Sequence, residues 1–177
     1  MTSLEHAVSV VEPWIVAYGV TALFVTILLE SFGAPLPSEV AIVSASVLAL
    51  RGDISIVSVF GAAWSAAVLG NTVGYLIGRI GGRPLFMRFG SHIGLTKDRF
   101  EKLAAPVRHN GFSVIVFARF VWILRQLNGV LAGALAMPIW RFVPANVIGA
   151  GLWVSVWALG PYFFATWFGV SSTVMKR

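Results

Sequence analysis

The chain has 177 residues, of which 58% are hydrophobic and 11% are charged, and its mean hydropathy is +0.85. Soluble domains average about 25% charged residues, so this composition excludes an ordinary soluble protein and indicates a single integral membrane domain over residues 1–177. The net charge of +6 is better explained by membrane topology and attraction to anionic lipid than by nucleic-acid binding, because no base-reading motif accompanies it.

The amino end, residues 1–12, carries two glutamates and no lysine or arginine. That charge is wrong for the leading region of a secretory signal peptide, so we expect the first hydrophobic segment to be retained. The sequence contains no cysteine, and its three histidines, His6, His92 and His109, lack the spacing of metal ligands. We therefore expect neither a metal nor a cofactor.

Residues 30–39 interrupt the first apolar region with two carboxylates, a glycine and two prolines. Pro35 and Pro37 each lack a backbone N–H and push the preceding residue out of the α region, so a helix has to break here. Broken backbone at membrane depth is tolerated only where it is buried in protein or lines a wet cavity. Glu30 and Glu39 are therefore candidate functional residues.

The apolar arms on either side of this break are short, and the second, Val40–Leu50, falls below the about 20 residues that span a bilayer as a helix. The pattern predicts a re-entrant helical hairpin over residues 12–53, with Gly33, Pro35 and Pro37 in its loop. The alternative is a full span that ends near Glu30 and is followed by an irregular return.

The next segment, residues 54–79, is long and apolar enough to cross the membrane. It contains glycines at four-residue spacing, a stripe that lets another helix approach closely. We expect Gly70, Gly74 and Gly78 to serve helix packing, within the chain or in a homo-oligomer.

Between residues 80 and 110 the chain becomes strongly basic, and with Arg79 this region holds seven cations against two carboxylates. By the positive-inside rule it should face the cytoplasm, which places both termini outside. Thr96 is a plausible N-cap, and apolar residues at helical spacing follow it. The pattern predicts a short amphipathic helix on the membrane surface.

Residues 111–137 are apolar again but contain Arg119 and Arg125, followed by a polar group of Gln126, Asn128 and two glycines. This repeats the earlier order of arm, polar break and arm, and predicts a second re-entrant hairpin. A last span follows over residues 139–170. Together these segments predict an all-α fold of two inverted repeats, each a re-entrant hairpin followed by a transmembrane helix, joined by the basic surface helix.

Charged side chains inside the apolar segments cost about 2.5 to 3.5 kcal/mol each at the bilayer centre, so they should meet one another or water. If the two hairpins dip from opposite faces, their tips bring Glu30 and Glu39 towards Arg119 and Arg125. One interpretation is a structural salt-bridge network. The other is a transport site, in which the arginines hold an anionic head group and the carboxylates carry coupling protons. The asparagines at positions 71, 128 and 146 could assist.

Several short motifs follow one another in order from Glu30 to Trp153. They combine the acidic Pro-Pro break, the glycine stripe, the two arginines and a set of small and aromatic residues. The motifs are Glu30-x4-Pro35-x-Pro37-x-Glu39, Gly70-x3-Gly74-Tyr75-x2-Gly78-Arg79, Gly111-Phe112, Arg119-Phe120-x4-Arg125, Ala132-Gly133, Met137, Phe142, Asn146, Gly149-Ala150 and Trp153.

This series resembles the DedA family of bacterial membrane proteins, whose domain is also called VTT or SNARE-associated. The resemblance implies an inner-membrane protein with two re-entrant hairpins that moves a lipid phosphate, either undecaprenyl phosphate or a phospholipid, with coupling to protons or membrane potential. The family's acidic pair maps to Glu30 and Glu39 and its arginine pair to Arg119 and Arg125.

The chain departs from the family pattern at two places. Ser38 stands where glycine is usual, and Trp122-Ile123 stands where a Pro-Gly pair is usual. We therefore expect the second hairpin to turn at Asn128-Gly129, with Gly133 also in its loop.

Two other functions stay open from the residues. One is a proton-coupled ion or drug antiporter supporting pH and envelope homeostasis, which would rely on the carboxylates alone. The other is a structural assembly protein whose buried charges hold helices together. An enzyme is not expected, because the sequence has no serine-histidine pair, metal cluster or phosphate-binding glycine loop.

Overall fold

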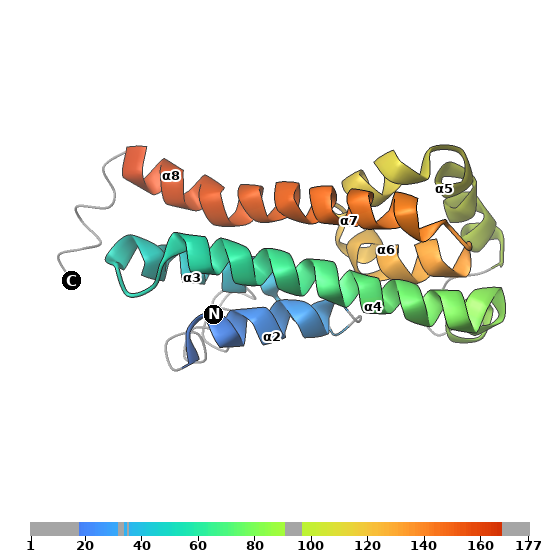
Figure 1. Ribbon diagram of the computed structural model, residues 1–177, viewed down its shortest axis with the longest axis horizontal. Coiled ribbons are helices and arrows are strands. Elements are labelled where there is room, and N and C mark those ends of the chain that lie inside the picture. The colour runs from blue at the N-terminus through green and yellow to red at the C-terminus, as the bar shows by residue number, and fades with distance from the viewer. Residues whose placement is uncertain (1–17, 32–33, 35, 91–96, 168–177) are drawn as a thin grey trace. The chain divides into compact units, whose positions relative to one another are not determined.

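The computed structural model of the protein describes residues 18–31, 34, 36–90 and 97–167. These residues form helices and turns and contain no strand, which confirms the predicted all-α class (Figure 1). The elements in chain order are α2 (Val20–Glu30), α3 (Ser38–Arg51), α4 (Ile56–Gly90), α5 (Lys97–Ala118), α6 (Trp122–Ala134), α7 (Ile139–Val154), the π-helical turn η2 (Ser155–Leu159) and α8 (Gly160–Trp167).

The chain forms two compact units. In its described part, unit 1 contains α2, α3, α4 as far as Ala67, and the last helical run from Gly151 onward. Unit 2 contains the rest of α4, both α5 and α6, and α7 as far as Ala150. Each unit therefore combines two consecutive helices, α2 and α3 or α5 and α6, with part of α4 and part of the last helical run.

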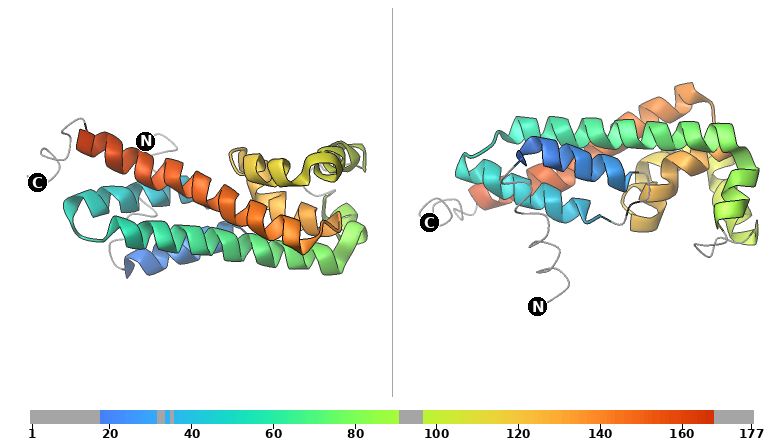
Figure 2. Two further views of the ribbon diagram at one scale, coloured as in Figure 1. Left: turned by 45° about the horizontal axis from the view of Figure 1, so that its top comes forward. Right: turned by 90° about the horizontal axis from the view of Figure 1, so that it is seen from below.

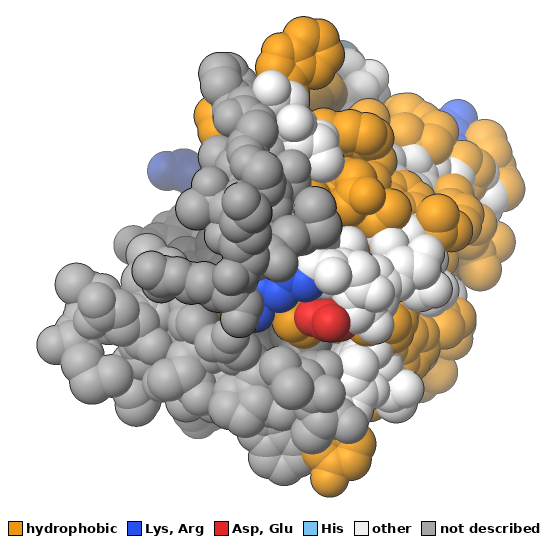
Figure 3. Space-filling model, turned by 90° about the vertical axis from the view of Figure 1, so that its left-hand side faces the viewer, with side chains coloured by type: hydrophobic (Ala, Val, Ile, Leu, Met, Phe, Trp, Pro, Cys, Tyr) orange, Lys and Arg blue, Asp and Glu red, His pale blue; other side chains and the backbone are white. Residues whose placement is uncertain are grey.

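Two of the helical stretches are long and apolar enough to cross a bilayer, Ile56–Gly81 and Ile139–Phe164, with 26 residues each. Large apolar side chains are exposed along both, including Val57 and Ile80 in the first and Leu152 in the second. Figure 3 shows hydrophobic side chains over much of the described surface of one face. Exposed apolar side chains in this number are costly in water, and they fit a surface that faces lipid.

Helix α4 extends further than the predicted span of residues 54–79, because it continues through Arg79 to Gly90. The predicted basic segment of residues 80–110 therefore begins as the end of α4 and continues in α5. The change from apolar to charged residues near position 79 indicates that the chain leaves the hydrocarbon region, but it does not mark the end of the helix. Arginine is a good helix former, so the helix continues through it.

The predicted break in the first hairpin is confirmed, since α2 ends at Glu30 and α3 begins at Ser38. Pro37 has φ −82° and ψ 72°, and the Ser38 amide donates to the Leu36 carbonyl at 3.0 Å, which together form an inverse γ-turn. Helices α2 and α3 pack side by side in opposite directions (Figure 2). Gly33 and Pro35 lie outside the described residues, and re-entry into the membrane stays a prediction.

The last helical run, predicted over residues 139–170, is interrupted by the π turn η2. The Gly160 amide donates to the Ser155 carbonyl, the five-residue step that defines this turn. Pro161, which has no N–H to offer, follows directly. Within unit 1, the single hydroxyl proton of Ser46 in α3 is shared between the Ala158 carbonyl at 3.0 Å and the Ile42 carbonyl of its own helix at 2.9 Å.

Helix α5 contains a kink at Asn110, where φ is −137° and ψ is 48°. The helix before the kink covers the predicted surface segment, and the helix after it is the first arm of the predicted second hairpin. Thr96, the predicted N-cap, lies outside the described residues, so the cap stays a prediction.

The second hairpin turns at a different place from the one predicted. Helix α5 ends at Ala118 and α6 begins at Trp122, so the turn lies at Arg119–Val121. The prediction of a turn at Asn128-Gly129 with Gly133 in its loop was wrong, because all three residues lie inside α6. Gly129 and Gly133 instead allow α6 to approach α4 closely. A close helix contact favours glycine because it has no side chain, and many turns favour glycine for the same reason.

Candidate functional site

Arg119 lies at the turn between α5 and α6, and its side chain is buried in unit 2 with 2% exposed. Backbone hydrogen bonds close this turn. The Phe120 amide donates to the Phe117 carbonyl at 3.1 Å, and the Val121 amide donates to the Ala118 carbonyl at 3.2 Å. The arginine is thus held on a closed turn and not on a frayed helix end.

The Arg119 side chain passes close to α7 because position 149 is a glycine. A Cβ at Gly149 would lie 3.2 Å from the Arg119 Cδ and 3.1 Å from the Val116 Cα. A larger residue would therefore push against the arginine. Gly149 belongs to the motif series, and its part in seating Arg119 could not be read from the sequence.

A polar network fixes the Arg119 guanidinium within unit 2. Arg119 donates through Nη2 to the Asn146 side-chain oxygen. The Asn146 Nδ2 in turn donates to the Val68 carbonyl at 3.0 Å and to the Thr72 Oγ1 at 3.2 Å, so α7 and α4 both support the arginine. Asn146 is thus the predicted assisting asparagine that contacts an arginine, and Thr72 is a member that sequence reasoning missed.

Arg125 occupies the first turn of α6 and is also buried, with 6% of it exposed. Its charge and that of Arg119 repel one another inside unit 2. Two buried guanidiniums with planar donor forks are suited to an anion such as a phosphate, which would relieve the repulsion. The structure therefore brings the two predicted arginines together.

The other two predicted asparagines brace helices in unit 2. Asn128 donates to the Ile115 carbonyl, in the last turn of α5, at 2.8 Å. Asn71 accepts a hydrogen bond from the Gly129 amide at 3.1 Å. Both side chains are buried. They hold together the helices around the arginines.

Helices α4 and α6 cross through glycines on both sides. A Cβ at Gly78 would overlap the Val130 carbonyl, and one at Gly133 would overlap the Tyr75 carbonyl. Gly74 faces Val130 at ordinary van der Waals distance, and Gly70 is buried in the same helix. Gly74 and Gly78 of the predicted stripe therefore lie at an intramolecular crossing that positions α6 and Arg125.

The predicted acidic residues flank the first break. Glu30 is the last residue of α2 and is buried, with 3% exposed. Glu39 lies in the first turn of α3 and is half-buried, and the Ser38 hydroxyl donates to its Oε2 at 3.4 Å. Both carboxylates belong to unit 1 and both arginines to unit 2, so the pairing between them stays a prediction.

Among the described residues, no cluster of histidine, aspartate or glutamate has the arrangement of a metal site. His92 lies outside them. The described candidate residues therefore supply guanidinium, amide and hydroxyl groups in unit 2 and, separately, two carboxylates in unit 1.

A family model, the VTT domain, matches residues 36–170. An uncharacterized membrane protein of Synechocystis sp. is 36% identical over 146 residues, covering 82% of this chain and 67% of that protein. An uncharacterized membrane protein of Mycobacterium tuberculosis H37Rv is 38% identical over 136 residues, covering 71% of this chain and 59% of that protein. Protein DedA of Escherichia coli K12 is 38% identical over 101 residues, covering 57% of this chain and 46% of that protein.

The chain thus spans between about half and two thirds of the length of these relatives. No solved structure matches it. The matched domain begins at the end of the first helix break and covers the second break, both long apolar helices and the two buried arginines. The chain therefore belongs to the VTT-domain (DedA) family of membrane proteins.

Proposed function

We propose that the protein moves a lipid phosphate across the bacterial inner membrane, with Arg119 and Arg125 binding the phosphate. The observation that carries the proposal is the pair of buried arginines at the α5–α6 turn, in a chain whose long helices are apolar. Two like charges in one buried place are costly, and a bound dianion or monoanion offsets that cost.

The substrate class follows from the donors. A guanidinium fork binds a phosphate bidentately, and its charge persists at physiological pH. Resemblance to the DedA family favours undecaprenyl phosphate or a phospholipid as the lipid. In this proposal Glu30 and Glu39, on either side of the first break, would carry the coupling protons. In this proposal both breaks are the tips of re-entrant hairpins related as inverted repeats.

A second function is favoured by the bond between Arg119 and Asn146. A guanidinium already tied to α7, and through Asn146 to α4, could serve only to hold helices together. The assembly-protein interpretation predicts that loss of the arginine lowers stability and activity in step. The antiporter interpretation, in contrast, predicts dependence on Glu30 and Glu39 and tolerance of arginine substitutions.

The test is transbilayer movement of undecaprenyl phosphate in liposomes containing the purified protein, with and without an imposed pH gradient. Phosphatidylethanolamine serves as the control lipid. Arg119→Lys and Arg125→Lys keep the charge and remove the fork, and we expect each to slow movement by about tenfold. Arg51→Gln, at an exposed arginine at the end of α3, is the matched control and should leave the rate unchanged.

The outcomes separate the three functions. Loss of movement in variants with an unchanged apparent melting temperature supports the phosphate site. Equal losses of movement and stability support the assembly role. Proton flux that survives both lysine variants but not Glu39→Gln supports the antiporter, and absence of lipid movement in the wild type contradicts the translocase.

A further inference from the structure

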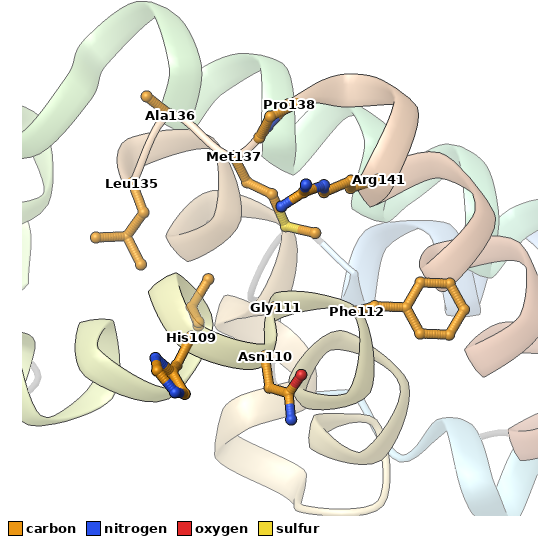
Figure 4. A pocket seen from close by; sticks show the side chains of 10 residues that line it. His109, Asn110, Gly111, Phe112, Leu135, Ala136, Met137, Pro138 and Arg141 are labelled. Atoms are coloured by element: carbon orange, nitrogen blue, oxygen red, sulfur yellow. The ribbon is translucent and has the colours of Figure 1, made fainter.

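A second place in unit 2 has the chemistry of an anion site, away from the α5–α6 turn. It is a cavity of about 450 Å³ between the kink of α5 and the turn that joins α6 to α7. Figure 4 shows His109 and Asn110 on one side of it and Met137, Pro138 and Arg141 on the other.

The cavity lies where two segments change from polar to apolar. Residues 97–108 of α5 carry four cations and two carboxylates, whereas His109–Ala118 is an apolar helix. The second candidate span begins at Ile139, directly after the turn. Both changes meet at the cavity, so it lies at the boundary between the aqueous side and the hydrocarbon, where lipid head groups are found.

The lining combines one cation with apolar walls. Arg141 supplies a guanidinium, which stacks 4.7 Å from the ring centre of Trp140, itself 64% exposed. Among the described residues that line the cavity there is no carboxylate to neutralise this charge. His109 and Asn110 add polar groups, and Phe112 and Leu135 add apolar surface. Exposed tryptophan beside arginine is typical of the interface level of a membrane protein.

The turn that lines the cavity is held in shape. The Tyr75 hydroxyl donates to the Met137 carbonyl at 2.6 Å, and the Tyr75 ring stacks on Phe142 at 4.5 Å. Helix α6 ends in a Schellman motif, with the Met137 amide donating to the Ala132 carbonyl at 3.0 Å and Ala136 at φ 56°. A non-glycine residue in this left-handed conformation is strained, and such strain is concentrated at binding sites.

From these observations we propose that the cavity binds the phosphate group of an anionic phospholipid from the leaflet on the basic side of the protein, through Arg141. The head group would contact Arg141, His109 and Asn110, and the start of an acyl chain would lie along Phe112 and Leu135. A free phosphate shares the head-group chemistry but leaves the apolar walls unused. The site is separate from the arginines of the proposed translocation path and does not depend on them.

The test is labelling of the full-length protein in phosphatidylcholine liposomes with a photoactivatable phosphatidylglycerol that carries a diazirine near its head group. Labelled residues are located by mass spectrometry. We expect labelling around Phe112 and Leu135, reduced by about tenfold in Arg141→Gln and largely retained in Arg141→Lys. Arg51→Gln and Arg119→Lys should label like the wild type, which separates this site from the proposed function.

Three results would overturn the proposal. The first is unchanged labelling at these residues in Arg141→Gln, and the second is equal labelling by the corresponding phosphatidylcholine probe. The third is loss of labelling when inorganic phosphate is added in excess, which would assign the site to the free anion and not to a lipid. Because Arg141 is exposed, Arg141→Gln should elute as the wild type does, and its apparent melting temperature checks this.

Discussion

Arg119 and Asn146, 27 residues apart in the chain, are joined by a buried hydrogen bond from the guanidinium Nη2 to the amide oxygen. The bond leaves the Asn146 Nδ2 to donate to α4, so one asparagine orients the arginine and ties two helices. This arrangement fixes where an incoming phosphate would meet the guanidinium. A site with its donors fixed in advance binds an anion without the cost of ordering them.

Asn146→Ala tests this orientation. Removing the amide leaves the Arg119 guanidinium with one partner fewer in a buried place, and we expect a loss of stability of about 1–3 kcal/mol together with loss of lipid movement. The matched control is Asn71→Ala, which removes another buried asparagine that bonds to the Gly129 amide. Asn71→Ala should lower the stability by a similar amount but keep most of the lipid movement. Equal activities in the two variants would contradict an orienting role, with melting temperature and transport measured in parallel.

Gly133→Ala tests the α4–α6 crossing. The added methyl group would overlap the Tyr75 carbonyl and lie 2.7 Å from the Arg79 amide nitrogen, so the helices have to separate. We expect a destabilisation of at least about 1–3 kcal/mol, the usual cost of overpacking. Gly61→Ala in α4 is the control, because a Cβ there meets nothing within 4 Å. It should be neutral or gain up to about 1 kcal/mol. Similar melting temperatures for both variants would show that the crossing is looser than the structure has it.

Ser46→Ala tests the support of the π turn in unit 1. The Ser46 hydroxyl donates to the Ala158 carbonyl inside η2, and its loss removes a bond between two helical segments. Such bonds in membrane proteins contribute about 0.6 kcal/mol on average and up to about 1.7 kcal/mol. Ser65→Ala is the control, since the bonds of Ser65 within the described residues go to carbonyls of its own helix, those of Gly61 and Ala62. A larger fall in melting temperature for Ser65→Ala than for Ser46→Ala would refute the assignment.

The first helix break could be predicted from sequence because its cause is local. Pro35 and Pro37 remove donors and restrict their neighbours whatever surrounds them, and α2 and α3 end and begin on either side of residues 31–37. The two long apolar helices follow in the same way from the length of each apolar run.

The second break could not be placed because its cause is tertiary. No proline or glycine marks Arg119–Val121, and Gly149 of α7 makes room beside Val116 and Arg119. Gly129 and Gly133 were misread because a turn and a close helix contact both require a missing side chain, and sequence does not distinguish them. The arginine pair could be identified because a charged side chain inside an apolar segment is energetically costly and therefore marks a candidate functional site. The bond from Arg119 to Asn146 could not be predicted, because Asn146 lies on another helix and sequence spacing does not show which residues of different helices meet.

Ala136→Gly tests the strained turn beside the Arg141 cavity. Ala136 holds φ at 56°, a conformation that costs a residue with a Cβ about 1–2 kcal/mol, so glycine should raise stability by about 1 kcal/mol. The matched opposite change is Gly52→Ala, because Gly52 ends α3 with the same pattern of bonds at φ 86°. It should lose about as much as Ala136→Gly gains. If Ala136→Gly instead destabilises the protein, the Cβ makes contacts worth more than the strain. If it raises the melting temperature but weakens phosphatidylglycerol labelling, the strained turn serves the lipid site.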